Sequence, residues 1–255
     1  MTAPRIFTPE YYARMRALES GGWWNAAMRD VAAMLLGGAG LPSAGTMLDV
    51  GCGSGQTMDW MLGRYPAWRA VGLDVAEDGL RAAHAAGLAV SRASALRLPH
   101  PDASVDLVIT LDVLQHLPLE GGDAVALAEM RRVLRPGGHL LLRTNAQAFP
   151  HTADDPAFNF HKYHPAELRE KLRAAGFTVL RLSRLNALLG LAEIPRELRA
   201  TRAQGEGYHG ILATPGGRVS LGATLKRRWL RLEGRAVGAG WALPFGRTIV
   251  ALCRA

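Results

Sequence analysis

The stretch Thr46–Gln56, TMLDVGCGSGQ, constrains the fold more than any other part of this 255-residue chain. Its first residues are a short apolar run that predicts a buried strand, and residues 56–64 have helix-forming character. Between them, Gly51, Gly53 and Gly55 alternate with other residues. Glycine accepts a positive φ and has no Cβ, so such a loop can approach a ligand closely at the N-terminus of a helix. The stretch therefore predicts a strand–loop–helix cradle for a nucleotide or nucleoside.

The spacing of the glycines distinguishes between two kinds of cradle. A dinucleotide fingerprint reads G-x-G-x-x-G, but its sixth position is Gln56 here and the third glycine, Gly55, comes one residue early. The stretch instead resembles the D-x-G-x-G-x-G motif of class I S-adenosylmethionine-dependent methyltransferases, which Asp49 and the three glycines match residue by residue. In that family the acid handles the amino-acid end of the cofactor. The alternative is a glycine turn with a structural role only.

A second acid closes the next predicted strand. Residues 69–74, RAVGLD, read as a strand ending at Asp74, 21 residues after Gly53, which is the interval that one helical crossover needs. A carboxylate there can accept hydrogen bonds from both ribose hydroxyls of a bound nucleoside. Nicotinamide enzymes use an acid in the same place, so Asp74 supports a nucleoside ligand without choosing between the two cofactors.

Later segments extend the resemblance. Residues 94–109, SALRLPHPDASVDLVI, are similar to the D-A-x-x-L-P-F-x-D-x-S-F-D-x-V run of many class I methyltransferases, with Ser94 in place of the acid that hydrogen-bonds the adenine amino group. A neutral acceptor is worth roughly 1 kcal/mol against about 1.5–3 kcal/mol for a charged one, so we expect a looser adenine site. The turn LRPGG at 134–138 is another recognisable feature of the family. The tetrapeptide Asn/Asp-Pro-Pro-Tyr, which marks enzymes that methylate nucleobase amino groups, does not follow the fourth strand.

The resemblance implies a cofactor and its contacts. It assigns S-adenosyl-L-methionine, with S-adenosyl-L-homocysteine as the product, to the carboxyl ends of strands 1, 2 and 4. The implied contact residues are Asp49, Gly51, Cys52, Gly53, Gly55, Gln56, Asp74, Val75, Ser94, Ala95, Thr110 and Leu111.

The resemblance also implies an α/β, Rossmann-like fold with a seven-stranded, mostly parallel sheet in the order 3-2-1-4-5-7-6. The methyltransferase core would comprise residues 46–185 and 246–255, preceded by an N-terminal helical cap, 1–45, and interrupted by a helical lid, 186–245. The strands are expected at 46–49, 69–74, 88–93, 105–110, 140–143, 177–185 and 248–254, and the core helices at 56–64, 77–86, 122–134 and 165–175.

Apolar periodicity predicts the helices of both segments, and the N-terminal one resembles the helical cap that covers the cofactor in small-molecule methyltransferases. The cap, with helices over 9–36, contains the pair Trp23-Trp24. In similar proteins an arginine follows four residues later, where this chain has Met28 and then Arg29. The lid is expected to hold helices at 188–202 and 219–237 around a glycine-rich hinge at 204–218. On the second helix an apolar stripe is predicted to pack on the domain, with basic side chains in solvent. The stripe is Leu221, Leu225, Trp229, Leu232 and Ala236, and the basic residues are Lys226, Arg227, Arg228, Arg231 and Arg235.

The net charge of +8 is concentrated in the C-terminal part of the chain. Residues 151–255 carry 17 basic and 8 acidic residues, against 13 and 14 in residues 1–150. An anionic substrate, a nucleic acid or a membrane surface would fit such a basic region, as would a compositional preference for arginine. The missing nucleobase-methylase tetrapeptide argues against nucleic acid. The helix at 219–237 is a candidate for peripheral contact with an anionic membrane.

Hydropathy gives an expectation for localisation. No apolar run reaches 18 residues, and no long apolar leader follows Arg5. We therefore expect a cytoplasmic protein without a membrane span. The oligomeric state does not follow from the sequence.

His116 is the main candidate for proton transfer. It lies in the segment LDVLQHL, 111–117, which resembles the part of the family that follows strand 4 beside the reacting methyl group. An imidazole titrates near neutral pH and can act as a general base. His161 and Tyr163 are further candidates because their loop, 145–164, is expected to face the same cleft. The alternative for His116 is a structural role in capping the loop.

No metal site is predicted. His151, His161 and His164 lie within 14 residues of one another but show no i, i+4 spacing on a predicted helix. The two cysteines, Cys52 and Cys253, are far apart in the sequence and join no histidine in a zinc-like spacing.

These patterns together predict an S-adenosylmethionine-dependent methyltransferase that methylates oxygen, nitrogen or carbon of a small molecule. The acceptor could be anionic or related to a sugar, a lipid or a natural product. One alternative is a methyltransferase of RNA or nucleotides, supported by the basic C-terminal part. The other is a nucleoside-binding protein of the same fold without catalysis, supported by Ser94 in place of the expected acid and by Met28 in place of the expected arginine.

Overall fold

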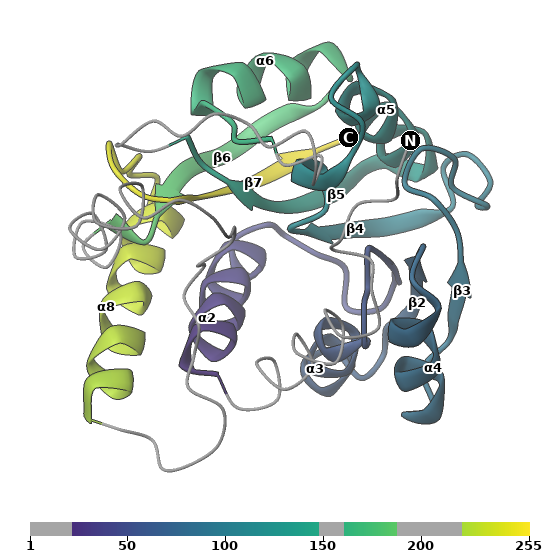
Figure 1. The fold of residues 1–255 in the computed structure, drawn as a ribbon, viewed down its shortest axis with the longest axis horizontal. Helices are drawn as coiled ribbons and strands as arrows, with labels where there is room; N and C mark the ends of the chain where they lie inside the picture. The colour runs from purple at the N-terminus through teal and green to yellow at the C-terminus, as the bar shows by residue number, and fades with distance from the viewer. Residues whose placement is uncertain (1–21, 148–160, 188–220) are drawn as a thin grey trace, which may run out of the picture.

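Seven strands form one mixed sheet within the part of the chain that the computed structural model describes, residues 22–147, 161–187 and 221–255 (Figure 1). Their order, β3-β2-β1-β4-β5-β7-β6, is the predicted one. β1 to β5 pair in parallel, and β7 is antiparallel to both β5 and β6. The strands are β1 (Thr46–Val50), β2 (Arg69–Asp74), β3 (Val90–Arg92), β4 (Val105–Leu111), β5 (Leu134–Asn145), β6 (Thr178–Leu185) and β7 (Thr248–Arg254).

Helices cover both faces of the sheet and enclose two apolar cores (Figure 1). On one face lie α2 (Trp23–Gly37), α3 (Gln56–Arg64), α4 (Glu77–Ala85) and α8 (Leu221–Gly238), and on the other lie α5 (Gly122–Val133) and α6 (Pro165–Ala174). The short 3₁₀ helix η2 (Leu114–His116) follows β4. Consecutive residues of the central strands are buried on opposite faces, which is why these strands read as continuous apolar runs rather than alternating ones.

The turn at 134–138 is built into the start of β5 rather than preceding it. Pairing with β4 passes from Val105↔Leu134 directly to Leu107↔His139, so the residues between them bulge out of the ladder. Gly137 takes a φ of +81° within this bulge. The expected start of the strand at residue 140 is therefore wrong, because the Pro-Gly-Gly turn returns the chain to the same neighbouring strand.

The second predicted lid helix packs on the domain through a different face from the one expected. The buried residues of α8 are Leu230, Glu233, Gly234 and Val237, and the predicted stripe through Leu221, Leu225 and Leu232 is exposed. Gly234 lies close against α2, since an added Cβ would come within 2.8 Å of Val31 Cγ2. The absence of a side chain at Gly234 allows this close approach between the two helices.

Glu233 fixes this orientation of α8. Its carboxylate accepts hydrogen bonds from the backbone N–H groups of Asn186, at 2.6 Å, and Ala187, at 3.1 Å, and from the indole N–H of Trp229, at 2.7 Å. A charged residue buried between α8 and the end of β6 is thus fully engaged by donors. The apolar periodicity of the sequence does not predict this buried face, because an acid, Glu233, lies in the middle of it.

Several predictions lie outside the described residues. They concern the first part of the cap, the lid helix at 188–202, the hinge at 204–218, and His151. Within the described residues, no helix is both long enough and apolar enough to cross a membrane.

Replacing Glu233 should destabilise the fold. Hydrogen bonds to a charged group are worth about 1.5–3 kcal/mol, so we expect Glu233→Ala to lower the free energy of unfolding by about 2–4 kcal/mol. Chemical denaturation monitored by circular dichroism measures this change. Glu170→Ala, which removes an exposed ion pair with Arg173, is the control and should change it by under about 1 kcal/mol. Equal effects of the two substitutions would contradict the role of Glu233.

Stability should fall as the pH falls below about 6.5, the ordinary value for a histidine. Burial, and secondly the charge of Arg254, lowers the pKa of His139 in the folded chain. The unfolded chain then binds a proton at a pH where the folded chain does not, so folding becomes less favourable on acidification. Thermal unfolding between pH 7.5 and 5.5 should show a smaller loss of stability in His139→Gln than in the parent. The exposed His84→Gln should behave as the parent, and an unchanged slope in His139→Gln would refute the assignment.

Candidate cofactor and acceptor site

Three strand ends come together at the carboxyl edge of the sheet. Asp49 of β1 is paired with Gly72 of β2 on one side and with Ile109 of β4 on the other. The residues that follow each of these strands therefore lie at one edge. In open α/β sheets this edge, at the point where the strand order reverses, is where ligands bind.

Left-handed backbone shapes the loop after β1. Gly51, Gly53 and Gly55 have φ values of +81°, +52° and +78°, which side-chain-bearing residues rarely adopt. An added Cβ would lie 2.1 Å from Val113 Cγ2 at Gly51 and 2.3 Å from Leu88 Cδ1 at Gly55, but would meet nothing within 4 Å at Gly53. The loop is thus packed tightly at both ends and open at Gly53, as a ligand cradle requires.

Asp74 holds this loop in place. Its Oδ2 accepts a hydrogen bond from the backbone N–H of Gly53 at 2.8 Å, and its Oδ1 accepts one from Ala76 at 2.8 Å. Burial raises the pKa of Asp74, and the backbone hydrogen bonds oppose that rise. The predicted ribose acid is therefore also the link between the glycine loop and the start of α4.

Asp49 precedes the loop in β1, and Cys52 lies within the loop. Asp49 is almost completely buried. Burial, and then the nearby carboxylates of Asp49 and Asp74, raises the pKa of the Cys52 thiol far above its ordinary value. Cys52 fits closely against Gly72, where an added Cβ would lie 2.7 Å from its sulfur.

Two glycines that the sequence reasoning missed also shape the cradle. A Cβ on Gly72 of β2 would come within 2.5 Å of Met58 Sδ, and one on Gly79 of α4 within 2.9 Å of the backbone of Gly53. Both glycines lie inside predicted regular elements, where a glycine often marks close backbone approach. A glycine within a predicted strand and another within a predicted helix could therefore have indicated these two close contacts from the sequence.

The remaining predicted cofactor contacts are differently exposed. Val75, directly after Asp74, is exposed, and its carbonyl accepts a hydrogen bond from Arg92 Nε at 3.1 Å. Ser94 Oγ accepts a hydrogen bond from the N–H of Leu96 at 3.2 Å, and Ala95 is buried. Among the predicted residues at the end of β4, Leu111 is half-buried. Thr110 is fully buried.

The cap reaches the glycine loop through Arg29. Its Nη2 donates a hydrogen bond to Gln56 Oε1 at 2.9 Å, which places a guanidinium beside the first residue of α3. Met28, at the position where the resemblance expects the arginine, is buried. Trp23 and Trp24 meet edge to face with ring centroids 6.0 Å apart. The arginine is therefore shifted by one residue along α2 and still lies against the cradle.

A charged pair marks the ends of β4 and β5. Asp112 has a φ of +61° and donates its backbone N–H to the carbonyl of Arg143 at 2.9 Å. Its Oδ2 accepts hydrogen bonds from Arg143 Nε, at 3.0 Å, and from a terminal nitrogen of the same guanidinium. Asp112 thus has a left-handed backbone conformation that both its backbone and its side chain stabilise, and the sequence reasoning did not predict it. Such strain is often found at functional sites.

Gln115 connects the loop after β4 to its neighbours. Its buried Oε1 accepts hydrogen bonds from Thr144 Oγ1 at 3.2 Å and from the N–H of Asn145 at 3.0 Å. Its carbonyl accepts one from the N–H of His161 at 2.9 Å. This residue carries no sequence signal of its importance, because a lone glutamine beside a histidine is not a recognisable pattern.

The three candidates for proton transfer lie in different settings. Tyr163 is buried, with its hydroxyl 3.1 Å from Asp123 Oδ2 and 3.3 Å from the carbonyl of Leu114. His161 packs edge to face on Tyr163 and has Nε2 3.2 Å from Glu167 Oε1. His116 is half-buried on η2, with Nε2 3.4 Å from Gln115 Nε2. Tyr163 is therefore a core residue that joins its segment to η2, and His116 is the candidate on the loop after β4.

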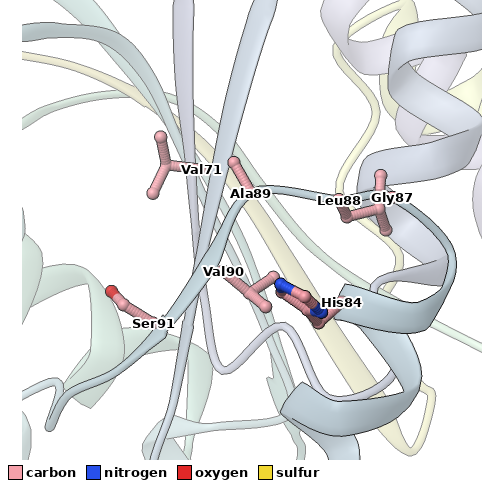
Figure 2. A pocket seen from close by; sticks show the side chains of 7 residues that line it. All are labelled: Val71, His84, Gly87, Leu88, Ala89, Val90 and Ser91. Carbon is pink, nitrogen blue, oxygen red and sulfur yellow. The ribbon is translucent and has the colours of Figure 1, made fainter.

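Among the described residues, no group of three or more His, Cys, Asp and Glu is arranged to hold a metal ion. An open concavity lies where the end of α4 turns into β3, lined by residues such as His84, Leu88 and Val90 (Figure 2). None of the predicted cofactor residues lines it, and Leu88 separates it from Gly55 at the end of the glycine loop.

Comparisons with known proteins agree with this geometry. Residues 48–142 match the methyltransferase domain family. A malonyl-[acyl-carrier protein] O-methyltransferase from Methylococcus capsulatus is 32% identical over 197 residues, which cover 71% of this chain and 70% of that protein. A trans-aconitate 2-methyltransferase from Azoarcus is 34% identical over 142 residues, 55% of this chain and 53% of that protein. The chain thus spans about half the length of the second relative. The two names give different acceptors.

A solved structure has a similar fold. It is that of a methyltransferase in a complex with the Haloferax volcanii Trm112 methyltransferase activator, with a TM-score of 0.63 and 20% identity over 99% of this chain and 97% of that one. With the sheet order, the glycine cradle and Asp74 in place, the chain belongs to the class I S-adenosylmethionine-dependent methyltransferase family.

Proposed function

We propose that the chain binds S-adenosylmethionine in the cradle around Gly53 and transfers its methyl group to a small molecule at the ends of β4 and β5. The observation that carries this proposal is the buried carboxylate of Asp74, hydrogen-bonded to Gly53 within a loop of three left-handed glycines. The open space at Gly53 and the exposed Val75 beside it fit a nucleoside. The bound cofactor supplies an electrophilic methyl group on a sulfonium.

The polar residues around the cradle have different proposed roles. A carboxylate has about four acceptor positions, so Asp74 can accept from ribose hydroxyls as well as from its two backbone donors. Arg29 provides a cation for the carboxylate at the amino-acid end of the cofactor, while Asp49 supports the same end from β1. Ser94 and Ala95 lie on the loop after β3, on the adenine side.

The acceptor is proposed to bind beside His116, Asp112 and Arg143. His116 and Asp112 lie on the loop after β4, and Arg143 lies near the end of β5. Val113, on the same loop, packs against Gly51 and so brings the loop beside the cradle. Holding an acceptor atom in line with the methyl group and excluding water would provide much of the acceleration. The segment 186–245 is proposed to cover the acceptor; its part at 188–220 lies outside the described residues.

A direct test combines binding with transfer of a labelled methyl group. Calorimetry should show binding of S-adenosylhomocysteine and no binding of NADH, which would distinguish the cradle from a dinucleotide site. With methyl-labelled S-adenosylmethionine, label should appear in the small-molecule fraction of a cell extract. Label in RNA alone, with a steep dependence on salt, would assign the nucleic-acid alternative. Binding without transfer to any fraction would assign the non-catalytic one.

Asp74→Asn should weaken cofactor binding. The substitution removes the charge and replaces one acceptor with a donor that faces a backbone N–H, so we expect a loss of roughly 10- to 100-fold in affinity for S-adenosylhomocysteine. Calorimetry on a variant shown to be folded measures it. Asp78→Asn, in the first turn of α4, is the matched control and should keep the parent affinity. The placement of the cofactor fails if folded Asp74→Asn binds as tightly as the parent.

His116→Gln should impair turnover if His116 takes a proton from the acceptor. Glutamine can keep a hydrogen bond but cannot act as a base, and general-base catalysis is typically worth about 10²–10⁴ in rate. Once an acceptor is known, kcat measured from pH 6 to 9 should fall by such a factor and lose its histidine-dependent limb. His161→Gln should have a smaller effect. Turnover of His116→Gln within a few-fold of the parent at every pH would give His116 a structural role only.

A further inference from the structure

The helix α8 presents a second apolar face, directed away from the sheet. Leu221, Leu225 and Leu232 are 86%, 64% and 53% exposed, and Trp229 is 39% exposed. Their spacing places them on one side of the helix, opposite the face that packs on α2 through Gly234. Figure 1 shows α8 as the outermost helix of its layer, with α2 between it and α3. This face is therefore not part of the apolar core of the domain.

The exposed apolar residues are concentrated in this region. Trp241 and Phe245, shortly after α8, are 72% and 63% exposed. Together with the four residues of the helix they are six of the nine exposed large apolar residues among those described. Single exposed leucines are ordinary, but a group of exposed leucine and aromatic side chains in one segment marks an interaction surface.

The charges beside this surface are positive. Arg228 and Arg235 are exposed and lie two turns apart along the edge of the apolar face. Arg227 and Arg231 approach Asp30 of α2, at 2.9 and 3.6 Å, and so join the helix to the cap. The one acid of α8, Glu233, is buried on the opposite side. The exposed apolar face is therefore bordered by cations without an intervening acid.

We propose that α8 and residues 241–245 form a docking surface for an anionic lipid membrane. Leucine and tryptophan side chains would enter the boundary between head groups and acyl chains, while Arg228 and Arg235 would contact phosphates. A nucleic acid would use the arginines but would gain little from three exposed leucines. A second copy of the chain would bring the same arginines against each other. The combination of apolar and cationic side chains on one face favours the membrane.

A continuous series of contacts joins α8 to the cofactor cradle. Its inner face packs on α2, and α2 carries Arg29, which is bonded to Gln56 at the start of α3. The docking proposal does not depend on methyl transfer, since it rests on exposure and charge alone.

Vesicle flotation of the full chain tests the proposal. The chain should float with vesicles of phosphatidylcholine and phosphatidylglycerol at low salt, and should float much less with phosphatidylcholine alone or at high salt. Leu225→Ser with Leu232→Ser should reduce the bound fraction at least about tenfold, as should Arg228→Glu with Arg235→Glu. The matched controls are Val125→Ser, an exposed apolar residue of α5, and Arg81→Glu with Arg173→Glu, which changes the net charge equally. Both controls should bind as the parent does, and thermal unfolding checks that every variant is folded.

Three outcomes would overturn the proposal. The first is an absence of binding to anionic vesicles at low salt. The second is an equal loss of binding in the control variants, which would indicate a general effect of charge or of apolar surface. The third is self-association in sedimentation velocity that Leu225→Ser with Leu232→Ser abolishes while vesicles are not bound, which would assign the face to a second copy of the chain.

Discussion

The hydrogen bond from the backbone of Gly53 to the carboxylate of Asp74 is the contact on which the cradle depends. It joins the end of β2 to a loop whose three glycines adopt left-handed conformations, and the second oxygen of the same carboxylate holds the N–H of Ala76, just before α4. A buried carboxylate is costly unless donors compensate its charge. Here one of the donors, the N–H of Gly53, belongs to the glycine loop itself. The hydrogen bond that compensates the buried charge therefore also fixes the shape of the loop.

The positions of the strands and of the glycine loop follow from local features of the sequence. Parallel strands buried on both faces read as short apolar runs. An acid, Asp49, is the last residue but one of β1, and Asp74 is the last residue of β2. The cradle was predictable because its backbone conformation requires glycine at Gly51, Gly53 and Gly55. Each of these features follows from the residue type at its own position and needs no knowledge of distant contacts.

The orientation of α8 and the loop after β4 could not be predicted in this way. The leucine stripe of α8 has the spacing of a core face, yet the helix buries Glu233 and Gly234, whose partners come from α2 and from the end of β6. Gln115 and the pair of Asp112 with Arg143 likewise depend on partners about 30 residues away. Long-range hydrogen bonds between polar residues leave no periodic pattern, so the sequence did not reveal them.

The central claim is that the glycine loop and Asp74 form the site of S-adenosylmethionine. Hydrogen–deuterium exchange of the full chain, with and without S-adenosylhomocysteine, tests it most directly because it reports the backbone amides themselves. The account predicts slower exchange in the peptides that contain residues 49–56 and 74–76, and no such change with NADH. Unchanged exchange in both peptides at saturating S-adenosylhomocysteine, or protection confined to the concavity between α4 and β3, would contradict it.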